Sequence, residues 1–196
     1  MKKIFAFAAM ALMVMGASAQ VNFGVKGGLN MSKMTEFTGV NDDDIDRLAG
    51  FNAGVVAEYP VALGIGLRGE LLFQTNGMKS ETSLVDQKLK TNNIVMPIMG
   101  EYTLPFLENR ISVYCGIQLG YCLGGVWTIN DNDVDLESDD YNAFDLSGVI
   151  GAEFMATDHI GIEGRFVRGT SEFFNPNIGD DFGKSNNFSL GLVYKF

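Results

Sequence analysis

The stretch that decides the fold is the end of the chain, Asn187-Phe188-Ser189-Leu190-Gly191-Leu192-Val193-Tyr194-Lys195-Phe196. Successive side chains of a strand point to opposite faces, so this segment has one apolar face and one small or polar face. The apolar face carries Phe188, Leu190, Leu192, Tyr194 and Phe196. The opposite face carries Ser189, Gly191 and Lys195. The first suits lipid and the second suits a lumen, as expected for a strand that closes a transmembrane barrel.

The beginning of the chain has the pattern of an export signal. Lys2 and Lys3 precede an apolar run from Ile4 to Met15, and Ala17-Ser18-Ala19 supplies small residues for a peptidase. The run is too short to span a bilayer comfortably as a helix, and no cysteine follows the expected cleavage site. The pattern predicts a signal peptide at residues 1–19 and a single exported domain at residues 20–196.

Seven further segments alternate in the same way, which gives eight expected strands. Their ranges are 22–32, 50–59, 65–78, 92–104, 110–124, 143–155, 160–170 and 187–196. The connections alternate between tight turns, at 60–64, 105–109 and 156–159, and long polar loops, at 33–49, 79–91, 125–142 and 171–186. A helical turn is expected only within a loop, at 40–49. This pattern predicts an all-β, eight-stranded antiparallel up-and-down transmembrane β-barrel, with short turns and both termini on the periplasmic side of the outer membrane.

The polar face of the expected strands carries charges of both signs. They are Lys26, Glu58, Arg68, Glu70, Glu101, Glu153, Glu163, Arg165 and Lys195. An eight-stranded barrel is just wide enough for side chains to fill, so these groups are predicted to form an internal ion network that plugs the lumen. A soluble barrel of the lipocalin kind is the alternative, and it would turn its apolar face inward.

Five glycines keep a different interpretation of the lumen open. Gly24, Gly28, Gly116, Gly120 and Gly191 fall in the expected strands, and small inward residues make room for a narrow passive channel.

Aromatic residues near strand ends are expected to form interfacial girdles, namely Tyr59, Phe73, Tyr102, Trp127, Phe154, Phe166 and Tyr194. Cys115 and Cys122 are too far apart along one strand to form a disulfide and are predicted to be packing residues.

Two segments resemble the outer-membrane β-barrel proteins of Bacteroidetes, the PorT-like or porin-family barrels. One is Phe23-Gly24-Val25-Lys26-Gly27-Gly28-Leu29-Asn30, which is similar to the family's glycine-rich first strand. The other is Asn93-Ile94-Val95-Met96-Pro97-Ile98-Met99-Gly100-Glu101-Tyr102, similar to a strand with an Ile-Pro-Leu core before Lys-Tyr, although Met96 precedes the proline and Gly100-Glu101 replaces the aliphatic and lysine positions. The resemblance implies the barrel architecture and, through one family member, a link to protein secretion. It assigns no functional residue.

Pro97 lies inside that second strand and removes a ladder donor from a barrel that has no free edge, so a local bulge is expected there.

No catalytic, cofactor-binding or metal-binding residue is predicted. The tract from Asp131 to Asp140 begins like a calcium-binding loop, but Leu136 and Asn142 occupy the positions that need glycine and glutamate. Loose binding of divalent cations there is the alternative to a solvated loop. His159 is the only histidine and falls in a tight turn on the periplasmic side, away from the outer rim. A barrel enzyme that acts on lipid would need an acid–base pair at that rim, so the chain is not expected to be an enzyme.

The charge of the chain limits its partners. The formal net charge is −10, and it becomes −12 when Lys2 and Lys3 are removed, which disfavours nucleic acid. The expected partners are outer-membrane lipid and extracellular or secretion-system proteins, with the barrel itself a monomer. The sequence thus favours a structural or interaction role through long acidic external loops, and a narrow porin-like channel for small solutes is the alternative.

Overall fold

The computed structural model describes residues 21–35, 45–82, 85–129, 132–135, 144–170 and 184–196. The predicted signal peptide at residues 1–19 lies outside this part of the chain. None of the helices formed by the described residues has the length and apolar character that crossing a membrane requires.

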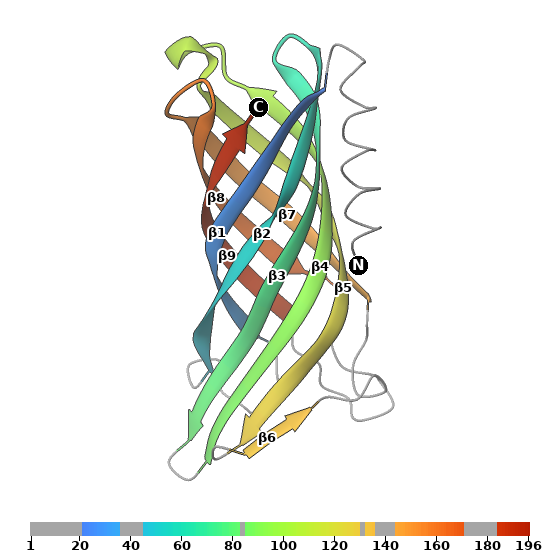
Figure 1. Ribbon diagram of the computed structural model, residues 1–196, viewed down its shortest axis with the longest axis vertical. Coiled ribbons are helices and arrows are strands. Elements are labelled where there is room, and N and C mark those ends of the chain that lie inside the picture. The colour runs from blue at the N-terminus through green and yellow to red at the C-terminus, as the bar shows by residue number, and fades with distance from the viewer. Residues whose placement is uncertain (1–20, 36–44, 83–84, 130–131, 136–143, 171–183) are drawn as a thin grey trace.

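Eight of the strands close into an antiparallel barrel, which confirms the predicted fold (Figure 1). The strands are β1 (Asn22–Thr35), β2 (Ile45–Ala62), β3 (Ile65–Thr82), β4 (Val85–Thr103), β5 (Ile111–Ile129), β7 (Phe144–Met155), β8 (Ile160–Gly169) and β9 (Lys184–Lys195). Each pairs with its neighbours in the chain, and β1 pairs with β9 to close the cylinder. A further short strand, β6 (Asn132–Asp135), pairs with the end of β5 outside the ring.

The tight turns and the end of β9 lie together at one end of the barrel, here called the short-turn end (Figure 1). Between β2 and β3 the chain reverses through Leu63 and Gly64, which have φ values of 53° and 80°. Positive φ at both central residues is the geometry of a two-residue hairpin turn whose twist matches the strands. Residues 104–110, with a 3₁₀ turn at Leu107–Asn109, join β4 to β5, and residues 156–159 join β7 to β8. The three predicted tight turns are confirmed.

The opposite end, here called the long-strand end, differs from the prediction (Figure 1). The expected loop at 79–91 is wrong, because β3 and β4 stay paired as far as Thr82 and Val85. The expected loop at 125–142 is wrong in part, since β5 continues to Ile129 and β6 pairs with it. Residues 45–49 belong to β2, so the helical turn is wrong for them, and residues 40–44 lie outside the described residues. The missed strands have a physical cause: where neither face of a strand needs to be apolar, the alternation of side chains fades although backbone pairing continues.

The outer face of the barrel is apolar. Leu29, Leu67 and Leu190 are 71%, 57% and 58% exposed, and most other large apolar side chains of the strands share this face. Lys26, Arg68, Glu70, Glu153, Glu163 and Arg165 are instead buried inside. The soluble alternative, which turns its apolar face inward, is therefore wrong.

Most of the expected girdle residues lie on this outer face. Tyr59, Phe73, Tyr102, Phe154, Phe166 and Tyr194 are exposed there. The side chain of Trp127 lies outside what the structure describes. Cys115 and Cys122 do not form a disulfide, as predicted, and Cys115 is exposed whereas Cys122 is buried.

Pro97 does not produce the expected bulge. Its side chain is buried on the inner face, and the register between β3 and β4 is the same before and after it. The ladder only lacks the pairs Glu70 with Pro97 and Leu71 with Met96, whereas Pro97 still pairs with Gln118 of β5. Proline has no N–H to donate, so the interruption is confined to one side of the strand and needs no extra residue.

Candidate functional site

The barrel interior near the short-turn end holds all nine of the charged residues that the sequence predicted to face inward. We call these residues and Tyr114 the charge network. Each barrel strand supplies at least one member: Lys26 from β1, Glu58 from β2, Arg68 and Glu70 from β3, Glu101 from β4, Tyr114 from β5, Glu153 from β7, Glu163 and Arg165 from β8, and Lys195 from β9. The alternation of the strands positions them, because every member shares the inward parity of its strand.

Arg68 is the centre of the network and is only 1% exposed. Its guanidinium donates to Glu70 Oε1 at 2.8 Å, Glu153 Oε2 at 2.7 Å and Glu163 Oε2 at 2.7 Å. Glu58 lies 3.3 Å and Glu101 3.9 Å from Arg68 Nη1. One guanidinium thus connects carboxylates from five different strands.

Arg165 forms a second centre beside it. Its two terminal nitrogens donate to both oxygens of Glu70, at 2.8 and 2.6 Å, in a bidentate pair. Arg165 Nη2 also donates to Glu163 Oε2 at 3.2 Å. Planar, two-bond pairs of this kind combine strength with a defined orientation, so Glu70 is held between the two arginines.

The two lysines come from the first and last strands of the barrel. Lys26 donates to Glu70 at 3.3 Å and to Glu163. Lys195 lies 2.8 Å from Glu58 Oε2 and 2.7 Å from Glu153 Oε1. Each lysine therefore connects a strand on one side of the β1–β9 pairing, β2 or β3, with a strand on the other side, β7 or β8.

Tyr114 completes the network, and the sequence analysis missed it. Both guanidinium groups lie over its ring, with Arg68 Cζ 4.9 Å and Arg165 Cζ 5.2 Å from the ring centroid, and its hydroxyl accepts from Arg165 Nε at 3.3 Å. Gly151 makes room for this ring, since a Cβ there would lie 2.4 Å from Tyr114 Oη. The signal was the parity of Tyr114, which lies two residues from inward Ser112 and Gly116.

Further inward side chains fill the barrel on the long-strand side of the network. An apolar cluster of Met99, Val149 and Val167 packs against Tyr114. Beyond it, Asn76 Oδ1 accepts from Asn30 at 3.2 Å, Gln74 at 2.7 Å and Asn187 at 2.9 Å. The sequence analysis did not single out this amide cluster, although all four of its members share the inward parity of their strands.

The glycines expected to open the lumen lie against neighbouring backbone instead. A Cβ at Gly24 would lie 2.6 Å from the Tyr194 carbonyl, one at Gly28 2.6 Å from that of Leu190, and one at Gly116 2.1 Å from that of Ile98. Gly191 and Gly120 also have close neighbours, at 3.0 Å and 3.3 Å. These glycines allow close approach of adjacent strands, and the expectation that they provide free space is wrong.

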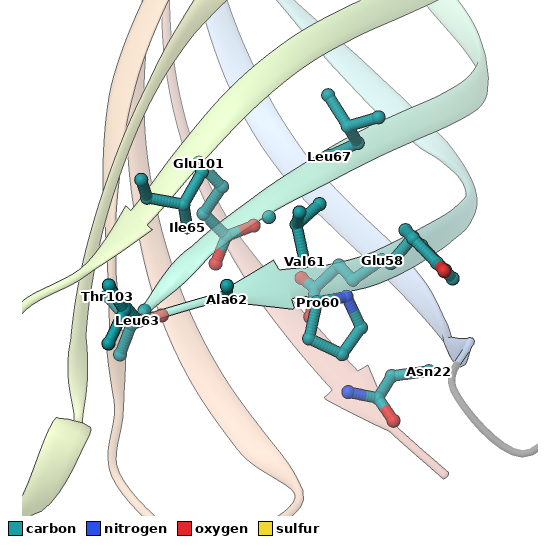
Figure 2. A pocket seen from close by; sticks show the side chains of 13 residues that line it. Asn22, Glu58, Pro60, Val61, Ala62, Leu63, Ile65, Leu67, Glu101 and Thr103 are labelled. Carbon is teal, nitrogen blue, oxygen red and sulfur yellow. The ribbon is translucent and has the colours of Figure 1, made fainter.

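A cavity of about 350 Å³ lies at the short-turn end, beside the turn between β2 and β3. Figure 2 shows Glu101 pointing toward this turn, with Pro60, Val61 and Leu63 around the opening. Glu58 also lines it. The network contains five carboxylates and four basic groups, so its formal charge is −1 and its acidic edge faces this opening.

The remaining polar residues considered from the sequence are His159 and the acidic tract. His159 is exposed in the turn between β7 and β8, as predicted, where its ring stacks on Tyr194 at 5.8 Å and its Nδ1 lies 2.8 Å from the Lys195 carbonyl. Within the described ranges, no group of three or more His, Cys, Asp or Glu residues is arranged to hold a metal. Of the acidic tract, Asn132–Asp135 form β6, and residues 131 and 136–140 lie outside the described residues.

Comparisons with known proteins agree with this architecture. A family model described as "Outer membrane protein beta-barrel domain" matches residues 16–175. A comparison with curated proteins finds no match.

Two solved structures show the same fold. Ail, the attachment invasion locus protein of Yersinia pestis, is 17% identical, with a TM-score of 0.55 over 90% of this chain and 99% of that one. Neisserial surface protein A is 15% identical, with a TM-score of 0.56 over 89% of this chain and 97% of that one. At these identities the likeness concerns the fold, and with the family match it leads to one conclusion: the chain belongs to the outer membrane protein beta-barrel domain family and is a protein of the outer membrane.

Proposed function

We propose that this protein is a structural or interaction component of the outer membrane whose lumen is filled by side chains. The observation that carries the proposal is the charge network, which joins all eight barrel strands and whose central groups, Arg68, Glu153 and Glu163, are at most 2% exposed. Ions that cross such a barrel would have to break buried, hydrogen-bonded pairs. The function then resides in the surfaces outside the bilayer.

The proposed orientation places the short-turn end in the periplasm and the long-strand end outside the cell. Short periplasmic turns and longer extracellular connections are the rule for outer-membrane barrels, which supports this assignment. The paired extensions of β3, β4, β5 and β6 would then stand on the external side together with the acidic loops. We propose that the protein is a monomer, because the eight described barrel strands close on themselves through the pairing of β1 with β9.

The chemistry of the external partner follows from charge. Ail has been solved in complex with the heparin analogue sucrose octasulfate, which is a polyanion. This chain has a formal net charge of −10 and an acidic tract from Asp131 to Asp140, so a polyanion is disfavoured here. A neutral or basic protein surface, of an extracellular or secretion-system partner, fits better.

The two strand motifs at residues 23–30 and 93–102 also support a place among the PorT-like barrels of Bacteroidetes.

Two further parts of the proposal concern processing and catalysis. The pattern of residues 1–19 supports their removal as a signal peptide, with residues 20–196 as the mature barrel. We propose no enzymatic activity, since the one histidine is a turn residue on the side assigned to the periplasm.

The test is single-channel conductance of the refolded mature protein in a planar bilayer, with heat-shifted gel mobility to verify folding. The filled-lumen proposal predicts no discrete openings from folded protein. Steady openings would contradict it and establish the alternative, a narrow passive channel. The variant Arg68→Ala is measured in the same assay, because loss of the central guanidinium removes the group that joins the carboxylates.

A further inference from the structure

The outer wall of the barrel has a groove that the charge network does not explain. A cavity of about 530 Å³ opens across β1 to β4 on the outward face. Its sides are formed by Phe23, Tyr59, Leu67, Leu71, Met96 and Ile98. Its floor is Gly69, where an added Cβ would meet nothing within 4 Å, next to its pairing partner Ala57.

The groove lies over the interruption in the β3–β4 ladder. Glu70, Leu71, Met96 and Pro97 all line it, and these four residues form the two pairs that the ladder lacks. Proline cannot donate to the Glu70 carbonyl, so this seam is held by fewer hydrogen bonds than its neighbours. The side chain of Glu70, on the inner side of the same seam, is bound by both arginines of the network.

This position requires an apolar cover. A backbone acceptor that faces hydrocarbon without a partner is costly, and water that entered through the seam would reach buried charges. An empty groove would also leave its lining side chains without packing partners. Side chains such as Leu67, Leu71 and Ile98 are about half exposed, at 57%, 52% and 48%, so they are available to an occupant from the bilayer.

We propose that this groove is a binding site for an acyl chain of a membrane phospholipid, which covers the seam at Pro97. The chemical class follows from the location, since the groove opens on the apolar outer face of an outer-membrane barrel. Its rim at Tyr59 and Phe23 lies toward the short-turn end, so the assignment to a periplasmic-leaflet phospholipid rests on the orientation proposed above. A bound chain at this site is independent of whether the lumen conducts.

The experiment is photocrosslinking of the refolded mature protein in phosphatidylcholine vesicles that contain a small fraction of phosphatidylcholine with a diazirine in its acyl chain. Adducts are mapped by mass spectrometry after proteolysis. We expect several-fold more adducts on Leu67, Leu71, Met96 and Ile98 than on the outward residues Ile162, Phe166 and Leu190 of β8 and β9. Equal labelling of both walls would overturn the proposal, because it would indicate bulk lipid only.

Matched glycine variants test whether the groove itself is responsible. Gly69→Leu fills the floor and is expected to reduce labelling of the groove to the level of the β8–β9 wall. Gly164→Leu adds the same side chain to an outward position of β8 that is equally open, and it should leave the labelling unchanged. If Gly69→Leu fails to show heat-shifted mobility, Ala57→Leu replaces it. Unchanged labelling in a folded filled variant, or crosslinks between two copies through these residues, would overturn the assignment to lipid.

Discussion

At the residue scale, the network concentrates its connections on a few side chains. Arg68 donates to three carboxylates, and the loss of its guanidinium would leave Glu70, Glu153 and Glu163 with fewer cations in a region of low dielectric. Removing one partner of a buried ion pair is far more costly than removing both, because the remaining charge stays buried and uncompensated. The same substitution at an exposed pair has little effect.

We therefore expect Arg68→Ala to lower the free energy of unfolding by about 3–5 kcal/mol. The measurement is the urea unfolding midpoint in lipid vesicles, followed by tryptophan fluorescence and gel mobility. Arg110→Ala is the control, because Arg110 is one-third exposed and pairs at 3.3 Å with the exposed Glu108. That control should cost no more than about 1 kcal/mol. An unchanged midpoint for Arg68→Ala would mean that Arg68 is in contact with water.

A second residue-scale prediction concerns the space for the Tyr114 ring. Gly151→Val places new atoms where the phenol lies, since even a Cβ would be 2.4 Å from Tyr114 Oη. We expect a loss of about 1–3 kcal/mol from this overpacking. Gly148→Val on the same strand meets nothing within 4 Å at its Cβ. It should change stability by less than about 0.5 kcal/mol, as most substitutions away from packed features do. Equal effects of the two variants in urea unfolding would argue against a fixed position of the ring.

At the scale of the elements, the strands near the long-strand end extend beyond the ranges that alternation predicts. Thr82 pairs with Val85 at the tip of the β3–β4 hairpin, and Gln87 to Lys90 pair with Val126 to Ile129 of β5. Backbone amides in such ladders are bound to carbonyls and not to solvent. Protection from exchange is the direct consequence of that pairing.

Hydrogen exchange tests the extension. In nanodiscs, peptides that cover residues 78–82 and 85–90 should exchange much more slowly than the exposed turn at residues 156–159. The predicted loop at 79–91 would instead exchange as fast as that turn. Rapid exchange of the amides throughout residues 78–90 would therefore contradict the paired extension and support the predicted loop.

The strands and the inward set could be predicted from sequence because both depend on one local property, the alternation of side chains. Lys26, Arg68 and Lys195, for instance, were assigned to the lumen from their own strands alone. The partners of each charge could not be predicted, since Arg68 and Glu163 meet across the lumen and are 95 residues apart. Tyr114 was missed because an aromatic residue on the inward face looks like one on the lipid face. At Pro97 the missing donor was foreseen, but a proline can interrupt a ladder without a change of register.

At the scale of the whole molecule, the buried position of the network predicts a weak response to salt. Exposed pairs are screened within about a Debye length of 10 Å at 0.1 M salt, whereas buried pairs are screened much less. The free energy of unfolding of the protein should thus change by less than about 1 kcal/mol between roughly 0.1 and 1 M sodium chloride. The measurement is urea unfolding at both salt concentrations with potassium chloride as a check on ion identity. A large loss of stability at high salt would show that water and ions reach the network.

The placement of the two lysines has a consequence for how the barrel is assembled. The middle strands, β2 to β8, contribute five glutamates and two arginines to the network, a formal charge of −3. Lys26 on β1 and Lys195 on β9 bring this to −1, and the pairing of these two strands closes the sheet into a cylinder. An unclosed sheet would hold an excess of negative charge facing its own future interior. Docking of the first and last strands then neutralises this charge in addition to forming backbone hydrogen bonds. The two lysines therefore stabilise the closed barrel relative to an open sheet.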